Sequence, residues 1–164
     1  MYLWVVRHAI AFPREETPAG LDPERPLTLK GRDRMEAAAI GIKHLGARPE
    51  RIVTSPYVRA HQTAEICAQF LGVPEVELSE SLEPDQDPMV LLQELEDQPD
   101  VDTMVIGHAP HVDLLIARLV RAPRPFTAMK KGSAACFELL GGPTSPGHLH
   151  WLHTPKQLRA LEPK

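Results

Sequence analysis

The fold of this chain is decided by its first stretch, Tyr2–Ala9 (YLWVVRHA), in which five apolar residues give way to Arg7 and His8. A continuous apolar run of this kind is typical of a strand buried on both faces of a parallel sheet. In open α/β sheets, ligands bind outside the carboxyl ends of the strands. Because Arg7 and His8 leave the strand at that end, they are the first candidates for chemistry.

Two later segments repeat this arrangement of strand, turn and helix. Arg51–Thr54 (RIVT) runs into Ser55–Arg59 (SPYVR), and Thr103–Ile106 (TMVI) runs into Gly107–Pro110 (GHAP). If the three strands lie parallel, the residues that follow them converge at one edge of the sheet. We expect four side chains to meet there: Arg7, His8, Arg59 and His108.

These residue types together indicate phosphoryl chemistry. The planar donors of arginine match phosphate oxygens bidentately and stay charged at any relevant pH. A neutral histidine attacks phosphorus through one ring nitrogen while a hydrogen bond holds the other. A lone histidine at a strand end is more often structural, so the interpretation depends on the joint occurrence of the three segments. The sequence therefore predicts a phosphate pocket that contains a nucleophile.

The rest of the chain alternates helical and extended patterns. Asp87 is a typical helix cap, and Gly72 is a typical helix stop. This alternation predicts an α/β fold whose largely parallel sheet is covered on both faces, with a closing hairpin at one edge. We predict helices over 30–45, 59–71, 88–96 and from 110 onward, and short strands over 76–78, 134–140 and 148–152.

Composition narrows the function classes. The chain has 164 residues, 43% of them hydrophobic, which is enough for one domain with a substantial core. A formal charge of −4 argues against a nucleic-acid partner, so any cationic pocket is local. Neither a secretion signal nor a membrane-spanning run is found in the sequence, and a cytoplasmic location is expected. Cys67 and Cys136 are interpreted as buried small hydrophobes without a disulfide.

The motifs resemble those of the histidine phosphatase superfamily, which includes the phosphoglycerate mutases. The resemblance runs from Met1 to about Trp151, and its narrower features resemble the SixA-type phosphohistidine phosphatase branch. It is carried by the segments Arg7–Ala9 (RHA), Arg25–Thr28 (RPLT), Thr54–Ala64 (TSPYVRAHQTA), Val105–His108 (VIGH) and Gly132–Cys136 (GSAAC).

The resemblance implies a three-layer α/β sandwich with a mostly parallel central sheet, and one histidine phosphatase domain over residues 1–164. It makes His8 the nucleophile that is transiently phosphorylated, and Arg7 and Arg59 the clamp on the phosphoryl oxygens. His108 becomes a second imidazole that donates to the same group. Arg25 matches a substrate-binding position near the pocket mouth, although a solvated surface arginine is an equal alternative. No metal or other cofactor is implied, because fixed cationic donors supply most of the catalysis of phosphoryl transfer.

The general acid is a point of departure from the family. Many members protonate the leaving group with a carboxylate from a loop that corresponds to Ser79–Asp87 (SESLEPDQD). Glu80 and Glu83 are the candidates, and an acidic loop that caps a helix is the alternative. Phosphohistidine releases neutral imidazole, which needs less proton assistance than an alkoxide, so a pocket without a clear acid suits that substrate.

The interval between Glu83 and His108 is short and holds one predicted helix and one predicted strand. Phosphoglycerate mutase-like relatives insert a lid there, which buries a small metabolite. A pocket without this insertion is open, and it suits a phosphorylated side chain on another protein better than a free sugar phosphate. The expected partner is therefore a phosphohistidine domain, with no nucleic acid and no membrane. The oligomeric state is left open.

Three other interpretations compete with this one. The chain could be a small-molecule phosphomonoesterase of the same superfamily, or a phospho-ligand binding module without turnover. Its eight histidines also prompt a metal protein, but a surface cluster is the favoured account of those near the carboxyl end, and His61 is expected on a helix surface or at the pocket rim. The histidines weighed as metal ligands are His108, His111, His148, His150 and His153.

Overall fold

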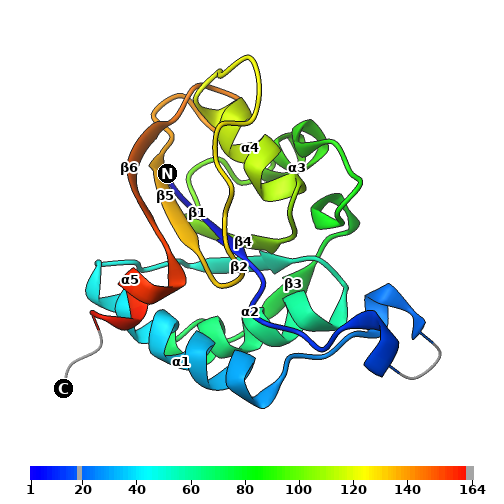
Figure 1. Cartoon of the computed structure of the whole chain (residues 1–164). Helices are drawn as coiled ribbons and strands as arrows, with labels where there is room; N and C mark the ends of the chain where they lie inside the picture. The colour runs from blue at the N-terminus through cyan, green and yellow to red at the C-terminus, as the bar shows by residue number, and fades with distance from the viewer. Residues whose placement is uncertain (18–19, 162–164) are drawn as a thin grey trace.

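The protein is a six-stranded sheet between two layers of helices, shown by a computed structural model that describes residues 1–17 and 20–161 (Figure 1). Across the sheet the strands follow the order β3-β2-β4-β1-β5-β6. The strands are β1 (Tyr2–Arg7), β2 (Arg51–Thr54), β3 (Val76–Leu78), β4 (Thr103–Gly107), β5 (Ala134–Glu138) and β6 (His148–His153). The helices are α1 (Leu29–His44), α2 (Val58–Leu71), α3 (Pro88–Leu95), α4 (His111–Leu119) and α5 (Pro155–Arg159).

Both faces of the sheet are buried, as the apolar run of β1 predicts. Helices α1, α2 and α5 lie on one face, and α3 and α4 lie on the other (Figure 1). Successive β1 side chains point to opposite faces of the sheet. Trp4 and Val6 therefore pack in the core under α1 and α2, and Leu3 and Val5 pack in the core under α3 and α4. Because helices cover both faces, a ligand can reach the sheet only at the ends of its strands.

The pairing of the strands confirms the expected α/β sandwich. β4 lies between β1 and β2 and is parallel to both, and β3 is parallel to β2. β5 is antiparallel to β1, and β6 closes the edge as an antiparallel hairpin with β5. The caps agree as well, since the Asp87 carboxylate accepts from the Met89 amide and Gly72 ends α2 with a φ of 79°.

The structure differs from the prediction at the carboxyl end. β5 ends at Glu138 instead of residue 140, and α5 follows β6, where no helix was expected. A helix of five residues is too short to show an amphipathic period in the sequence. Its stability comes from a capping box at Thr154 and from Leu158, which packs on α1 where Gly41 leaves no side chain in the way.

Two smaller expectations are also tested. Cys67 and Cys136 are both buried and free of a disulfide, as their patterns indicate. Within residues 1–17 and 20–161, the helices are all too short or too polar to cross a membrane.

Candidate active site

The two central histidines are brought together by strand register. β1 and β4 are adjacent and parallel, and Arg7 lies opposite Gly107, so the next residue of each strand is a histidine. The His8 amide donates to the Gly107 carbonyl across 3.0 Å. The ring centroids of His8 and His108 are 5.0 Å apart. Sequence positions 100 residues apart thus form one site because neighbouring parallel strands end together.

The His8 ring is oriented and kept neutral. Its Nδ1 lies 2.7 Å from the Ala9 carbonyl oxygen, which can only accept, so Nδ1 carries the proton and Nε2 keeps a lone pair. Burial lowers the pKa of His8 to about 3. The hydrogen bond to the Ala9 carbonyl raises this pKa, but the charges of Arg59, Arg7 and Lys131 lower it further. His8 therefore presents a free lone pair at neutral pH.

Arg59 covers that lone pair. It lies in the first turn of α2, as predicted, and its Nε–H donates to Nε2 of His8 across 3.2 Å. The terminal nitrogens donate to the backbone carbonyl of Asp22 at 2.7 Å and to its carboxylate at 2.9 Å. The residue is only 3% exposed, so burial and these bonds fix its fork in one orientation.

Arg7 reaches the same centre from the end of β1. Its Nη1 donates to the Met129 carbonyl at 2.5 Å, which anchors the guanidinium to the segment before β5. Its Nε is buried and makes no hydrogen bond to any of the described residues. A buried donor without a partner is costly, and an anion beside His8 would satisfy it.

His108 completes the group. Its ring is 1% exposed, and its Nε2 lies 2.9 Å from the Ser55 hydroxyl oxygen. That oxygen already accepts from the Tyr57 amide at 3.3 Å, so its own proton is available for Nε2. Nδ1 is then left with a proton, and it is buried without a partner among the described residues. Burial lowers the pKa of His108 to about 2, and the neighbouring His8 and Arg59 act in the same direction.

Arg25 is linked to this group through Asp22. Its Nε donates to the Asp22 carboxylate at 2.8 Å, and its Nη1 donates to the Phe12 carbonyl at 3.1 Å. The same carboxylate is bonded to Arg59, so Arg25 joins the pocket through Asp22 and makes no bond to His8. Burial disfavours the ionised carboxylate, but the bonds and charges of the two arginines lower the pKa of Asp22 overall.

The two acid candidates differ in their surroundings. Glu80 is exposed in a short 3-10 helix, Glu80–Leu82. Glu83 is half-buried beside Tyr57, whose pKa is raised by burial and then by the charge of Glu83. The Tyr57 ring packs at 5.0 Å from the His108 ring. Of the two candidates, Glu83 is therefore the one placed near the pocket.

Three further residues belong to the site although the sequence motifs did not single them out as functional: Asp22, Ser55 and Lys131. Asp22 could have been found by its position three residues before Arg25 in the same loop. Lys131 precedes β5, which runs antiparallel to β1 and so begins at the edge where β1 ends. Only this topology reveals Lys131.

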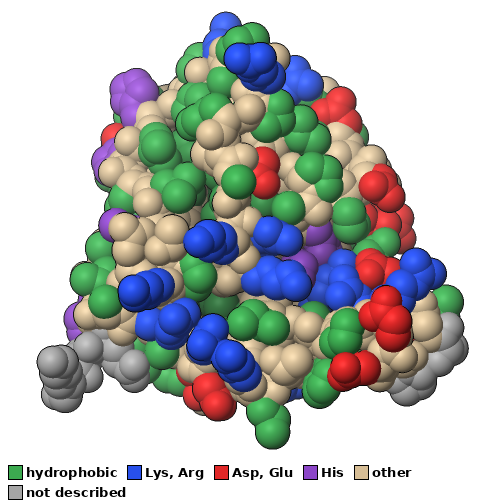
Figure 2. Space-filling view, in the orientation of Figure 1, with side chains coloured by type: hydrophobic (Ala, Val, Ile, Leu, Met, Phe, Trp, Pro, Cys, Tyr) green, Lys and Arg blue, Asp and Glu red, His purple; other side chains and the backbone are tan. Residues whose placement is uncertain are grey.

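Lys and Arg side chains surround the recessed histidines on this face of the molecule, while acidic side chains gather beside them (Figure 2). The positive charge is thus local on a chain whose formal charge is −4. A field of this kind favours a phosphate group and steers anions toward the site.

The other histidines lie apart from this centre or are used differently. His150 contacts the Glu138 carboxylate at 3.1 Å, and His153 stacks on Trp151. His111 is buried at the start of α4, and burial lowers its pKa to about 4. The backbone of Ser81 acts in the opposite direction and raises this pKa. Over residues 1–17 and 20–161, no three His, Cys, Asp or Glu side chains are grouped so as to hold a metal ion.

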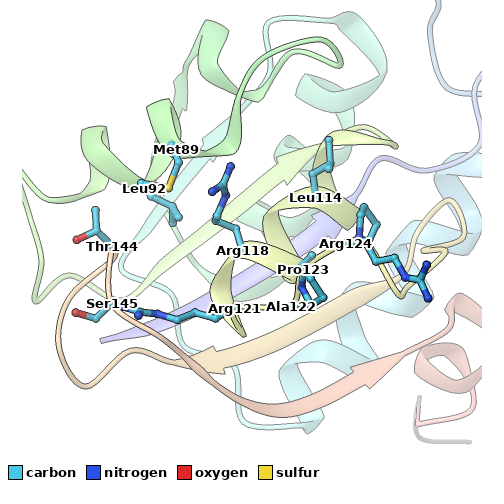
Figure 3. A pocket seen from close by; sticks show the side chains of 12 residues that line it. Met89, Leu92, Leu114, Arg118, Arg121, Ala122, Pro123, Arg124, Thr144 and Ser145 are labelled. Atoms are coloured by element: carbon cyan, nitrogen blue, oxygen red, sulfur yellow. The ribbon is translucent and has the colours of Figure 1, made fainter.

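A separate cavity of about 490 Å³ lies between α3, α4 and the loop before β6. Arg118, Arg121 and Arg124 line it, but their side chains point in different directions and do not converge on one point (Figure 3). None of the four central residues lines this cavity. The candidate active site is therefore the His8 centre.

Comparison with known proteins agrees with this geometry. The family model of the histidine phosphatase superfamily (branch 1) matches residues 3–83. An uncharacterized protein of Picosynechococcus is 36% identical over 113 residues, which is 67% of each chain. Phosphohistidine phosphatase SixA of Escherichia coli is 30% identical over 165 residues, which is 97% of each chain.

Solved structures give the same result. The protein histidine phosphatase SixA complexed with tungstate superposes with a TM-score of 0.85 at 28% identity, covering 96% of this chain and 99% of that one. A SixA described as a phosphohistidine phosphatase from Agrobacterium tumefaciens shares the fold at 19% identity, with a TM-score of 0.77 and coverage of 94% and 97%. With relatives this similar along nearly its whole length, the chain belongs to the SixA branch of the histidine phosphatase superfamily and is a phosphohydrolase.

Proposed function

We propose that this protein removes phosphate from phosphohistidine on another protein, with residues 1–164 acting as one histidine phosphatase domain. The observation that carries the proposal is the contact of the His8 Nδ1 with the Ala9 carbonyl oxygen at 2.7 Å. Nδ1 is tied to the Ala9 carbonyl, so the lone pair on Nε2 faces Arg59 in a pocket of fixed donors. The names of the SixA relatives support phosphohistidine as the substrate class.

In the first step, Nε2 of His8 attacks phosphorus as the bond from phosphorus to the substrate imidazole breaks. A substrate ring that is protonated on its second nitrogen leaves as neutral imidazole, and no carboxylic acid is required. Arg7, Arg59 and Nδ1–H of His108 donate to the three phosphoryl oxygens, where the charge of the transition state is spread.

In the second step, water attacks phosphorus and the bond to Nε2 breaks. Because Nδ1 keeps its proton on the Ala9 carbonyl, His8 also leaves as neutral imidazole. The water proton passes to the released phosphate, and the enzyme returns to its starting state. Positive charge is supplied by arginine side chains, and we propose that turnover needs no metal ion.

The short interval between Glu83 and His108 supports a protein substrate. Between Glu83 and His108 the chain forms only α3 and β4, and α3 packs beside α4 on the far face of the sheet from α2 (Figure 1). The helix of this interval thus lies on the opposite face of the sheet from α2, which carries Arg59. A protruding histidine side chain can therefore approach, whereas a free metabolite would be poorly enclosed.

The test is a rapidly quenched reaction with a phosphohistidine protein, followed by mass spectrometry under conditions that preserve acid-labile phosphate. We expect phosphate on His8 during turnover, no phosphoenzyme in His8→Ala, and unchanged activity with a strong chelator. Faster hydrolysis of sugar or nucleotide phosphates than of the phosphoprotein would support a small-molecule phosphatase instead. Phosphate binding without any turnover would identify a binding module.

A further inference from the structure

A small recess lined by cations lies beside the reaction pocket. Three elements supply its charged side chains, namely Arg34 from α1, Arg159 from α5 and Lys131 from the segment before β5. Its volume is about 40 Å³. These three residues and the space between them form the cationic recess.

The cationic recess shares a wall with the reaction pocket. Ala9 and Gly132 line it, and Ala9 directly follows His8. The Gly132 amide donates to the carbonyls of Arg7 at 3.0 Å and His8 at 3.1 Å. The recess therefore lies against the backbone of the segment that carries Arg7 and His8.

Lys131 links the two sites electrostatically. Its pKa is lowered by burial and then by the charges of Arg7, Arg25 and Arg59. Those are the charges of the reaction pocket, so Lys131 lies within their field while its side chain also lines the recess. An anion in the recess would relieve this repulsion among cations.

The charges of the cationic recess are not matched by carboxylates in the part of the chain that the structure describes. Within residues 1–17 and 20–161, Arg34 and Lys131 form no ion pair, whereas Arg25, Arg51 and Arg59 each bind a carboxylate within 3 Å. Unmatched cations around a concave site favour an anionic ligand, in a chain that is acidic overall.

The volume of the recess suits a small anionic group. A buried water needs about 10–15 Å³ of such space, so the recess of about 40 Å³ holds roughly three atoms of that size. A carboxylate has three heavy atoms and fits. A sugar ring or a nucleobase requires a cavity several times larger.

We propose that the cationic recess binds a carboxylate of the substrate protein, from an Asp or Glu beside the phosphohistidine. This inference rests on the proposed function, since the phosphoryl group and the carboxylate belong to one partner surface. The recess then selects phosphohistidine proteins with an acidic neighbourhood. It contributes to binding and takes no part in the phosphoryl transfer.

The test uses two peptides with a stable phosphonate analogue of phosphohistidine, one flanked by glutamates and one by glutamines. Affinities are measured by fluorescence anisotropy at low salt for wild type, for Arg34→Gln/Arg159→Gln, and for Lys43→Gln. Lys43 is an exposed cation at the far end of α1, so Lys43→Gln lowers the positive charge on the same helix away from the recess. Inhibition by inorganic phosphate reports whether the reaction pocket is intact.

We expect wild type and Lys43→Gln to prefer the glutamate peptide by roughly 5- to 10-fold, and the double variant to lose this preference with unchanged phosphate inhibition. Equal binding of both peptides by wild type would overturn the inference, as would an equal loss in Lys43→Gln. If the recess residues instead make the protein bind a sugar bisphosphate more tightly than the monophosphate, the proposal of a protein carboxylate as the ligand would be wrong. Hydrolysis of genuine phosphohistidine peptides tests the proposed function separately, because the analogue needs no turnover.

Discussion

In this structure the Nε–H of Arg59 donates to Nε2 of His8 across 3.2 Å. The atom proposed to attack phosphorus is thus covered by the cation proposed to hold the phosphoryl oxygens. Arg59 can fill these two roles one after the other. An incoming phosphoryl group offers it charged acceptors, which are stronger than a neutral ring nitrogen. The hydrogen bond also keeps the His8 lone pair directed into the pocket until the substrate arrives.

Arg59→Lys tests this arrangement. Lysine keeps the charge but lacks the planar fork, so it cannot bind His8, Asp22 and phosphoryl oxygens in fixed geometry. We expect kcat to fall by roughly 10²- to 10³-fold on a phosphohistidine peptide. Steady-state kinetics check this, and a variant with near wild-type kcat would show that charge alone suffices.

Asp22→Asn tests the role of the carboxylate that bridges Arg59 and Arg25. Removing it leaves Arg59 less well oriented, so we expect kcat to fall by about 10-fold. It also removes a negative charge from the pocket, so KM for an anionic substrate should fall as well. Glu24→Gln in the same loop is the control, since that exposed side chain forms no ion pair with the described residues. A change in KM alone would contradict an orienting role.

Ser55→Ala tests the tautomer of His108. The Ser55 hydroxyl holds Nε2 at 2.9 Å, which leaves Nδ1–H for the substrate. Without it, the other tautomer becomes accessible and the donor is lost in part, so kcat should drop by about 10-fold with little change in KM. Ser55→Thr keeps the hydroxyl and should retain more activity than Ser55→Ala. Equal kcat in wild type and Ser55→Ala would contradict the assignment.

Stability should fall steeply in mild acid. Burial lowers the pKa of three histidines from the ordinary value of 6.5: His8 to about 3, His108 to about 2 and His111 to about 4. The unfolded chain binds these protons below pH 6.5, whereas the folded chain does not until about pH 4. The free energy of unfolding therefore decreases between these values, by up to about 1.4 kcal/mol per pH unit for each group, and is unaffected above them.

Urea unfolding at pH 7, 6 and 5 measures this slope. His111→Leu removes one of the three titrating groups and should reduce the slope by about a third. Leu115→Ala is the control, because it removes buried apolar volume on the same helix and should lower stability equally at every pH. A slope unchanged by His111→Leu would show that this histidine does not titrate as its burial requires.

The layers of the fold and the centre of the site follow from local patterns in the sequence. The apolar run of β1 requires burial on both faces, and each of the three strands is followed by a functional residue type at its carboxyl end. The apolar run and the residues that follow each strand are visible in short segments, because hydrophobic periodicity and turn composition involve neighbouring residues. His8, His108 and Arg59 were found in this way, and the structure brings them together.

The side chains that orient these residues are set by tertiary packing. Asp22 bonds to Arg59 across 37 positions, and Ser55 to His108 across 53, so no local pattern contains either pair. Lys131 reaches the pocket because β5 is antiparallel to β1, and Arg159 joins Arg34 because α5 docks on α1. Strand order and helix docking depend on contacts between residues that are far apart in the chain, so they cannot be inferred from local patterns in one sequence.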